Sequence, residues 1–185
     1  MAIAFATAPT GADDTIHAFL NGFVGGGFLE QMPAKARFDP HDVSISECLR
    51  MYYLRDDDLA AARPLDQARP GGWRYLLVSG GSVINDICVD SDATGKPVVV
   101  STSIDTPLTA STVAALLAAE ADPRTAAQDY EARELYCARA EYVAVLWLHG
   151  AAGDLFVPMA PTVVAGPIAH HQVYDAATFL AWLKR

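Results

Sequence analysis

Three histidines near the C-terminal end are the first candidates for chemistry, because imidazole binds transition metals and transfers protons near neutral pH. His149 ends a predicted strand, and His170 and His171 follow in a loop further along the chain. Adjacent residues of an extended segment point to opposite sides, so at most one of that pair can join His149 as a ligand. Asp154 or Asp175 would supply a carboxylate, but no HExxH-like spacing is present. We therefore predict no metal ligand and no cofactor, and leave open whether the histidines converge in space.

A thiol beside an imidazole is the second candidate, since Cys137 and His149 could form a nucleophile and its base. A reactive thiol needs a cationic, partly exposed setting, to which Arg139 would contribute. Cys48, Cys88 and Cys137 are far apart in sequence and form no CxxC pair, so we expect all three to be reduced and buried. No GxSxG motif is present either. The sequence therefore predicts no catalytic residue.

Acidic and glycine-rich segments are explained without a site. Glu131 and Glu134 are three residues apart and would share one solvated face of a predicted helix. Arg133 follows Asp129 by four residues on that helix and can form an ion pair with it. The acidic run 56–58 is expected to cap a short helix. It does not have the alternating spacing of a calcium-binding loop. The glycines 25–27 follow a helix rather than precede one, which is the wrong order for a phosphate-binding loop.

Aromatic residues are the remaining signal. Four of them flank two arginines around the middle of the chain, and an aromatic pocket with an arginine is a common way to bind a small acidic molecule. Packing in the core would explain most of these rings equally well. The aromatic residues are Tyr52, Tyr53, Trp73 and Tyr75, and the arginines are Arg55 and Arg74.

The clearest elements are three strands in the middle of the chain, over 73–79, 82–89 and 97–103, with a tight turn at Gly80-Gly81. A two-residue turn would place Val83 opposite Val78 and Ile84 opposite Leu77. That register puts Asp86 on the face that carries Tyr75, and Arg74 on the other face. A buried Asp86 would need a partner, because an unpaired buried carboxylate is costly.

The other elements are predicted from apolar spacing and capping residues. We expect an α+β fold, with an antiparallel sheet of about five strands (meander 73–103 plus hairpin 141–159) packed against helices. Residues 1–185 form a single domain, with a helical N-terminal subdomain over 12–68 as a further division. The predicted helices start at Asp13 or Asp14, at the capping box 44–47, at Thr109, at Pro123 (ending near Cys137) and after Asp175, and the hairpin strands are 142–149 and 155–159.

Composition excludes several classes of protein. With 52% apolar and 19% charged residues the chain is globular, and a net charge of −9 disfavours nucleic acid and anionic membranes as partners. No apolar stretch reaches the roughly 20 residues that span a bilayer, and the first residues do not resemble a signal peptide. We therefore expect a cytoplasmic protein, and the Ala/Arg/Gly-rich composition is typical of bacteria.

Function is predicted mainly by elimination. No group of residues stands out as a site, while the apolar fraction is high enough to leave surface for an interface. The expectation is a non-catalytic protein-interaction or self-association module that forms a homo-oligomer. The alternative is a small-molecule-binding or hydrolytic domain that uses the aromatic pocket or the Cys137/His149 pair, so the sequence leaves enzyme and binding module undecided.

Overall fold

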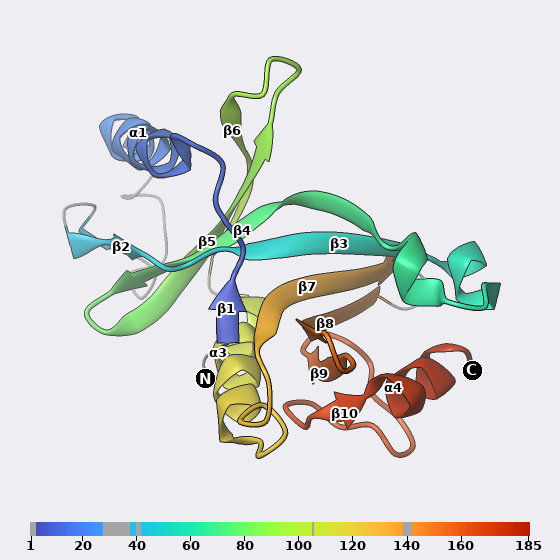
Figure 1. The fold of residues 1–185 in the computed structure, drawn as a ribbon. Coiled ribbons are helices and arrows are strands. Elements are labelled where there is room, and N and C mark those ends of the chain that lie inside the picture. The colour runs from blue at the N-terminus through green and yellow to red at the C-terminus, as the bar shows by residue number, and fades with distance from the viewer. Residues whose placement is uncertain (1–2, 28–37, 40–41, 105, 139–141) are drawn as a thin grey trace.

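The computed structural model describes residues 3–27, 38–39, 42–104, 106–138 and 142–185. Within these ranges ten strands form one mixed sheet, accompanied by three α-helices and the short 3-10 helices η3 and η4 (Figure 1). The strands are β1 (Ile3–Phe5), β2 (Ser44–Ile45), β3 (Leu49–Arg55), β4 (Arg69–Ser79), β5 (Ser82–Ser91), β6 (Pro97–Ile104), β7 (Tyr130–Ala138), β8 (Tyr142–Gly150), β9 (Leu155–Met159) and β10 (Tyr174–Asp175). The helices are α1 (Ala12–Gly25), η3 (Asp56–Ala60), η4 (Pro64–Gln67), α3 (Pro107–Ala121) and α4 (Ala176–Leu183).

The sheet has the strand order β10-β9-β8-β7-β3-β4-β5-β6, with β1 beside β7 and β2 beside β4. Its centre is parallel, because β3 and β1 both run parallel to β7, whereas the remaining pairs are antiparallel. Figure 1 shows β4, β5 and β6 extending away from the layer that β7, β8 and β9 form. The two halves of the sheet therefore meet along β3.

The predicted five-stranded antiparallel sheet is wrong, because the sheet is twice that size and mixed. Two segments predicted as helices are strands: the one after Ser44 forms β2 and β3, and the one from Pro123 to Cys137 contains β7. Pairing with neighbouring strands decides both, since β-propensity depends on context more than on local sequence. Instead of capping a helix, the Ser46 hydroxyl accepts a hydrogen bond from the backbone N–H of Leu76 at 2.9 Å.

The three mid-chain strands are present as β4, β5 and β6, and Val78 pairs with Val83 as predicted. The predicted register fails at the next pair, because a bulge places Leu77 opposite Asn85 instead of Ile84. A shift of one residue moves every later side chain of that strand to the other face. Asp86 therefore lies on the face opposite to the predicted one.

Three α-helices pack against the sheet, and each is formed by a segment that was predicted to be helical. In Figure 1, α1 lies beside β5 and β6, α3 covers β5, β8 and β9, and α4 lies beside β9 and β10. Phe179 of α4 stacks on Phe156 of β9 with ring centroids 4.5 Å apart. Asp175 caps α4 as predicted, accepting from the N–H of Thr178 at 2.8 Å. In the part of the chain that the structure describes, no helix is both long and apolar enough to cross a membrane.

Candidate functional site

A buried arginine joins three strands of the sheet to α3. Arg74 of β4, Asp86 of β5 and Glu134 of β7 are only 2%, 3% and 0% exposed. Arg74 Nη2 donates to Asp86 Oδ2 at 2.8 Å, and Nη1 donates to Glu134 and to the hydroxyl of Thr112. Charged groups this deeply buried are tolerated only when paired and hydrogen-bonded, as they are here.

Hydroxyl groups donate further hydrogen bonds to both carboxylates. Thr109 of α3 donates to Asp86 Oδ2 at 2.6 Å, and the Tyr136 hydroxyl donates to Glu134 Oε2 at 2.6 Å. Both carboxylates act only as acceptors in these contacts, as ionised carboxylates do. We call this set the Arg74 cluster. It consists of Arg74, Asp86, Glu134, Thr109, Thr112 and Tyr136.

The bulge between β4 and β5 makes the cluster possible. It places Asp86 opposite Leu76 and Cys88 opposite Arg74, so that Arg74 and Asp86 lie on one face of the hairpin. In the register without a bulge, Asp86 would face the side of Tyr75 instead. The salt bridge therefore depends on one extra residue in β5.

The guanidinium of Arg74 is held in its charged form. Burial by itself would lower the pKa of Arg74, but the charge of Glu134 and the hydrogen bond and charge of Asp86 outweigh burial and raise that pKa. The cluster thus contains one fixed positive charge between two acceptor carboxylates. It carries an excess of negative charge inside the protein.

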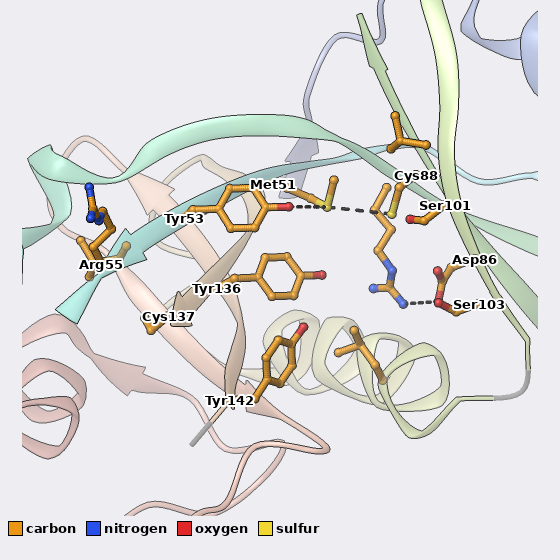
Figure 2. A pocket seen from close by; sticks show the side chains of 14 residues that line it. Met51, Tyr53, Arg55, Asp86, Cys88, Ser101, Ser103, Tyr136, Cys137 and Tyr142 are labelled. Carbon is orange, nitrogen blue, oxygen red and sulfur yellow. Dashed lines mark hydrogen bonds and ion pairs between the residues drawn. The ribbon is translucent and has the colours of Figure 1, made fainter. Parts of the chain in front are cut away.

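A cavity of about 400 Å³ opens beside the cluster. Figure 2 shows Tyr53, Tyr136 and Tyr142 on one side, with their hydroxyl groups directed toward Asp86 and Cys88 on the other side. The rings of Tyr53 and Tyr136 are stacked at 5.6 Å, and those of Tyr136 and Tyr142 are tilted at 5.9 Å. We call it the tyrosine cavity. Its lining residues are Met51, Tyr53, Leu54, Arg55, Arg74, Asp86, Cys88, Val100, Ser101, Ser103, Leu108, Tyr136, Cys137 and Tyr142.

Gly71 makes room for one of these rings. A Cβ atom at position 71 would come within 2.3 Å of Cε2 of Tyr53, which is closer than real Cβ contacts allow. Glycine on β4 therefore lets the Tyr53 ring lie flat against the backbone and point into the cavity.

The Cys88 thiol and the tyrosine hydroxyls that line the cavity stay protonated at neutral pH. Burial is the main cause that raises the pKa of the Cys88 thiol to about 11 and the pKa of Tyr142 to about 12. Burial also raises the pKa of Tyr53 and of Tyr136, the latter strongly. These groups are therefore neutral hydrogen-bonding groups, and Cys88 is not a thiolate nucleophile.

Alkylation of Cys88 by iodoacetamide should follow this raised pKa. Because only the thiolate reacts, we expect the rate at Cys88 to rise about tenfold per pH unit up to about pH 10. Peptide mapping by mass spectrometry measures that rate. An Ala93→Cys variant supplies the control, since position 93 is exposed at the β5–β6 turn and its thiol should reach a plateau near pH 9. A plateau at Cys88 by the same pH would contradict the assignment.

The histidine and cysteine candidates do not come together. His149 lies opposite Glu131 of β7, whereas Cys137 lies six residues beyond Glu131, about 20 Å away along an extended strand. His149 Nδ1 lies 2.8 Å from Asp154 Oδ1. Arg139 lies outside the described residues.

The two adjacent histidines have separate partners. His170 Nε2 lies 2.7 Å from the carbonyl oxygen of Thr162, and His171 Nε2 lies 2.6 Å from the hydroxyl of Ser111. Ser111 is itself buried and accepts a hydrogen bond from the N–H of Ala160 at 2.8 Å. Among the described residues, no three His, Cys, Asp or Glu side chains are placed to hold a metal ion.

The strands place the acidic candidates apart from each other, and they place only one of the aromatic candidates at the tyrosine cavity. Glu131 and Glu134 do not share a helix face: Glu134 is buried in the Arg74 cluster, and Glu131 pairs with Arg133 at 2.7 Å. Of the four aromatic candidates, Tyr53 alone is among the lining residues of the tyrosine cavity. Arg74 lines this cavity, but its positive charge is already paired with the carboxylates of Asp86 and Glu134. It is therefore not free to serve as the anchor for an acidic ligand.

Several site residues escaped sequence analysis. Tyr136 and Tyr142 stood in predicted elements without any functional assignment, and Ser101 and Ser103 belonged to a strand of ordinary composition. One signal was available, because a carboxylate inside the apolar strand 82–89 required a partner. The sequence could not identify Arg74 as that partner, because the predicted register placed Arg74 and Asp86 on opposite faces of the hairpin.

A second hollow, of about 610 Å³, lies on the opposite side of β7 beside Trp147 and η4. Its ionisable side chains already pair with one another or with a neighbour, which leaves fewer groups for a ligand. The pairs are Arg63 with Asp66, Arg133 with Glu131, and His149 with Asp154.

Comparison with protein-family models, with curated proteins and with solved structures finds no match in any of the three. The function considered below therefore rests on the geometry of the Arg74 cluster and the tyrosine cavity alone.

Proposed function

We propose that the protein binds a small organic molecule in the tyrosine cavity. The observation that carries this proposal is a hollow of about 400 Å³ whose lining includes the buried ion pair of Arg74 and Asp86. Sites for small molecules have volumes of this order, mostly apolar walls and a few polar groups that converge. The tyrosine rings, Met51 and Leu108 supply apolar wall, and the hydroxyls and Asp86 supply the polar groups.

Exposed apolar side chains gather around this cavity. Among the described residues seven large apolar side chains are exposed, and three of them line the tyrosine cavity. An apolar surface around a hollow is favourable for binding, because a ligand removes it from water. These three residues are Tyr53, Val100 and Tyr142.

Binding fits the chemistry of the cavity better than catalysis. The Cys88 thiol has a pKa of about 11, and its causes include burial and the charges of Asp86 and Glu134. Asp86 Oδ2 and both oxygens of Glu134 already accept hydrogen bonds from Arg74 or from hydroxyl groups. No described group here combines a nucleophile with an available base, which nucleophilic catalysis requires.

The cellular setting belongs to the same proposal. We place the protein in the reducing cytoplasm, since its three cysteines are not joined in disulfides in the described structure. Self-association stays a prediction from the sequence, and sedimentation over a range of concentrations would test it.

Filling the tyrosine cavity from its exposed edge should weaken binding strongly. In wild-type protein we expect saturation-transfer NMR to detect ligands from a library of aromatic and aliphatic fragments. A Val100→Trp variant should lower the affinity for these fragments by about tenfold or more, because the indole occupies the volume that they need.

Val163→Trp is the matched control. Val163 is 57% exposed and Val100 is 56% exposed, but Val163 does not line the cavity. The control should bind the fragments like wild type. Equal binding by the two tryptophan variants, or the absence of any bound fragment in wild type, would reject the proposal.

A further inference from the structure

We infer that the ligand of the tyrosine cavity is an organic cation, whose positively charged nitrogen lies beside Asp86 while its apolar body lies against the tyrosines. This inference rests on the proposed function and adds the charge of the ligand to it. It follows from the unequal charges of the Arg74 cluster and from their effect on the groups around the cavity.

Charge imbalance is the first step. The cluster combines the guanidinium of Arg74 with the carboxylates of Asp86 and Glu134, so it holds one positive and two negative charges. Asp86 lines the cavity, and its Oδ2 accepts from both Arg74 and Thr109. Among the described residues none donates a hydrogen bond to Asp86 Oδ1. An ammonium group has three N–H donors and can supply the missing one.

The side chains around the cavity respond to a negative potential. After burial, which has the largest effect, Glu134 raises the pKa of Tyr142 more than Arg74 lowers it. At Cys88, Asp86 and Glu134 each raise the pKa more than Arg74 lowers it. For Tyr53 the charge of Glu134 again raises the pKa. Negative charge of the cluster thus outweighs the guanidinium at Cys88 and at Tyr142.

Arg55 does not reverse this potential. It also lines the cavity, but it is exposed to solvent, and Figure 2 shows it at the end far from Asp86. Solvent weakens the field of an exposed charge, whereas the buried carboxylates act through a medium of low polarity. The positive charge of Arg55 is therefore felt mainly at that end.

The remaining wall suits a cation as well. The aromatic faces of Tyr53 and Tyr142 are electron-rich, and both side chains are about half exposed, so a ligand can reach them. The hydroxyl of Tyr142 makes no hydrogen bond to another described residue, so its oxygen can accept one from a ligand. An anion would find Arg74 already engaged with two carboxylates, and its own charge would be repelled.

Three probes with nearly the same shape separate charge from size. We would titrate 3-phenylpropylammonium, 3-phenylpropanol and 3-phenylpropanoate into wild-type protein by calorimetry at neutral pH. The expected result is that the ammonium binds about tenfold more tightly than the alcohol, and that the carboxylate binds more weakly than both.

One variant adds a positive charge to the cavity and leaves the residues of the Arg74 cluster unchanged. Ser101 lines the cavity and is exposed, so Ser101→Lys places a cation in it and should weaken the ammonium about tenfold while changing the alcohol by less than about threefold. Ala93→Lys adds the same charge at the exposed β5–β6 turn and should leave all three affinities unchanged.

The outcomes separate the inference from the proposed function. Alcohol binding that equals or exceeds ammonium binding rejects the cation while preserving the cavity as a binding site. An equal loss of ammonium affinity in Ser101→Lys and Ala93→Lys also rejects it. If none of the three probes binds although fragments do, the inference alone fails. If neither the probes nor any fragment binds, the proposed function fails with it.

Discussion

Replacing Arg74 with methionine is expected to lower the free energy of unfolding by about 3–5 kcal/mol. The change removes the positive charge that lies between Asp86 and Glu134 and leaves two carboxylates buried without a counter-ion. Methionine keeps most of the apolar stem of the side chain, so the loss reflects charge more than volume. Chemical denaturation followed by circular dichroism measures it.

The stability of the Arg74→Met variant should depend on pH in a defined direction. In the Arg74→Met variant the folded protein must take up a proton to hold both carboxylates in its interior, whereas the unfolded chain keeps them ionised at neutral pH. The folded state then binds more protons than the unfolded state, so stability rises as the pH falls from about 8 to about 5. Wild type, in which the positive charge of Arg74 lies between the two carboxylates, should gain less stability over this range.

Two further variants control the experiment. Arg63→Met removes an arginine whose side chain is 81% exposed, and should change stability by no more than about 0.5 kcal/mol. The triple variant Arg74→Met/Asp86→Asn/Glu134→Gln removes all three charges and should recover part of the loss, because no buried charge is left unpaired. If Arg74→Met costs no more than Arg63→Met, the buried salt bridge does not exist as described.

Shortening Leu135 to alanine is the second large effect, at about 2–5 kcal/mol. Leu135 is fully buried on β7, between its pairing partners Tyr52 of β3 and Val145 of β8. The substitution removes buried apolar surface and leaves a cavity in the middle of the sheet, which close-packed neighbours cannot fill completely.

Leu117→Ala is the matched control, since Leu117 of α3 is 61% exposed. It should change stability by no more than about 0.5 kcal/mol. Equal costs for the two leucines would contradict the burial of Leu135 on β7.

Elements that depend on neighbours in sequence were predicted well. The helix from Thr109 has a run of apolar residues and a proline before it, and the C-terminal helix has Asp175 as its cap, so both are encoded locally. The hairpin turn at Gly80-Gly81 is likewise local, because both glycines adopt positive φ there. Such signals need no information from the rest of the chain.

Segments that depend on distant partners were not predicted. The sequence of β7 is also compatible with a helix that has an acidic face. Pairing with β3 on one edge and with β8 on the other holds these residues in a strand. The parallel pairing of β3 with β7 joins segments far apart in the chain, and no local pattern encodes it. The mixed sheet follows from that one long-range pairing.

For the site, the sequence by itself determined that a buried Asp86 would need a partner, that the cysteines form no obvious metal or redox motif, and that the chain has an apolar interior. The tertiary structure alone decided that the partner is Arg74, because a single-residue bulge rotates Asp86 onto its face. It also decided that Glu134 and the hydroxyls of α3 converge there. A side chain's type is local information, but which face it occupies and what it meets depend on strand register and packing between distant segments.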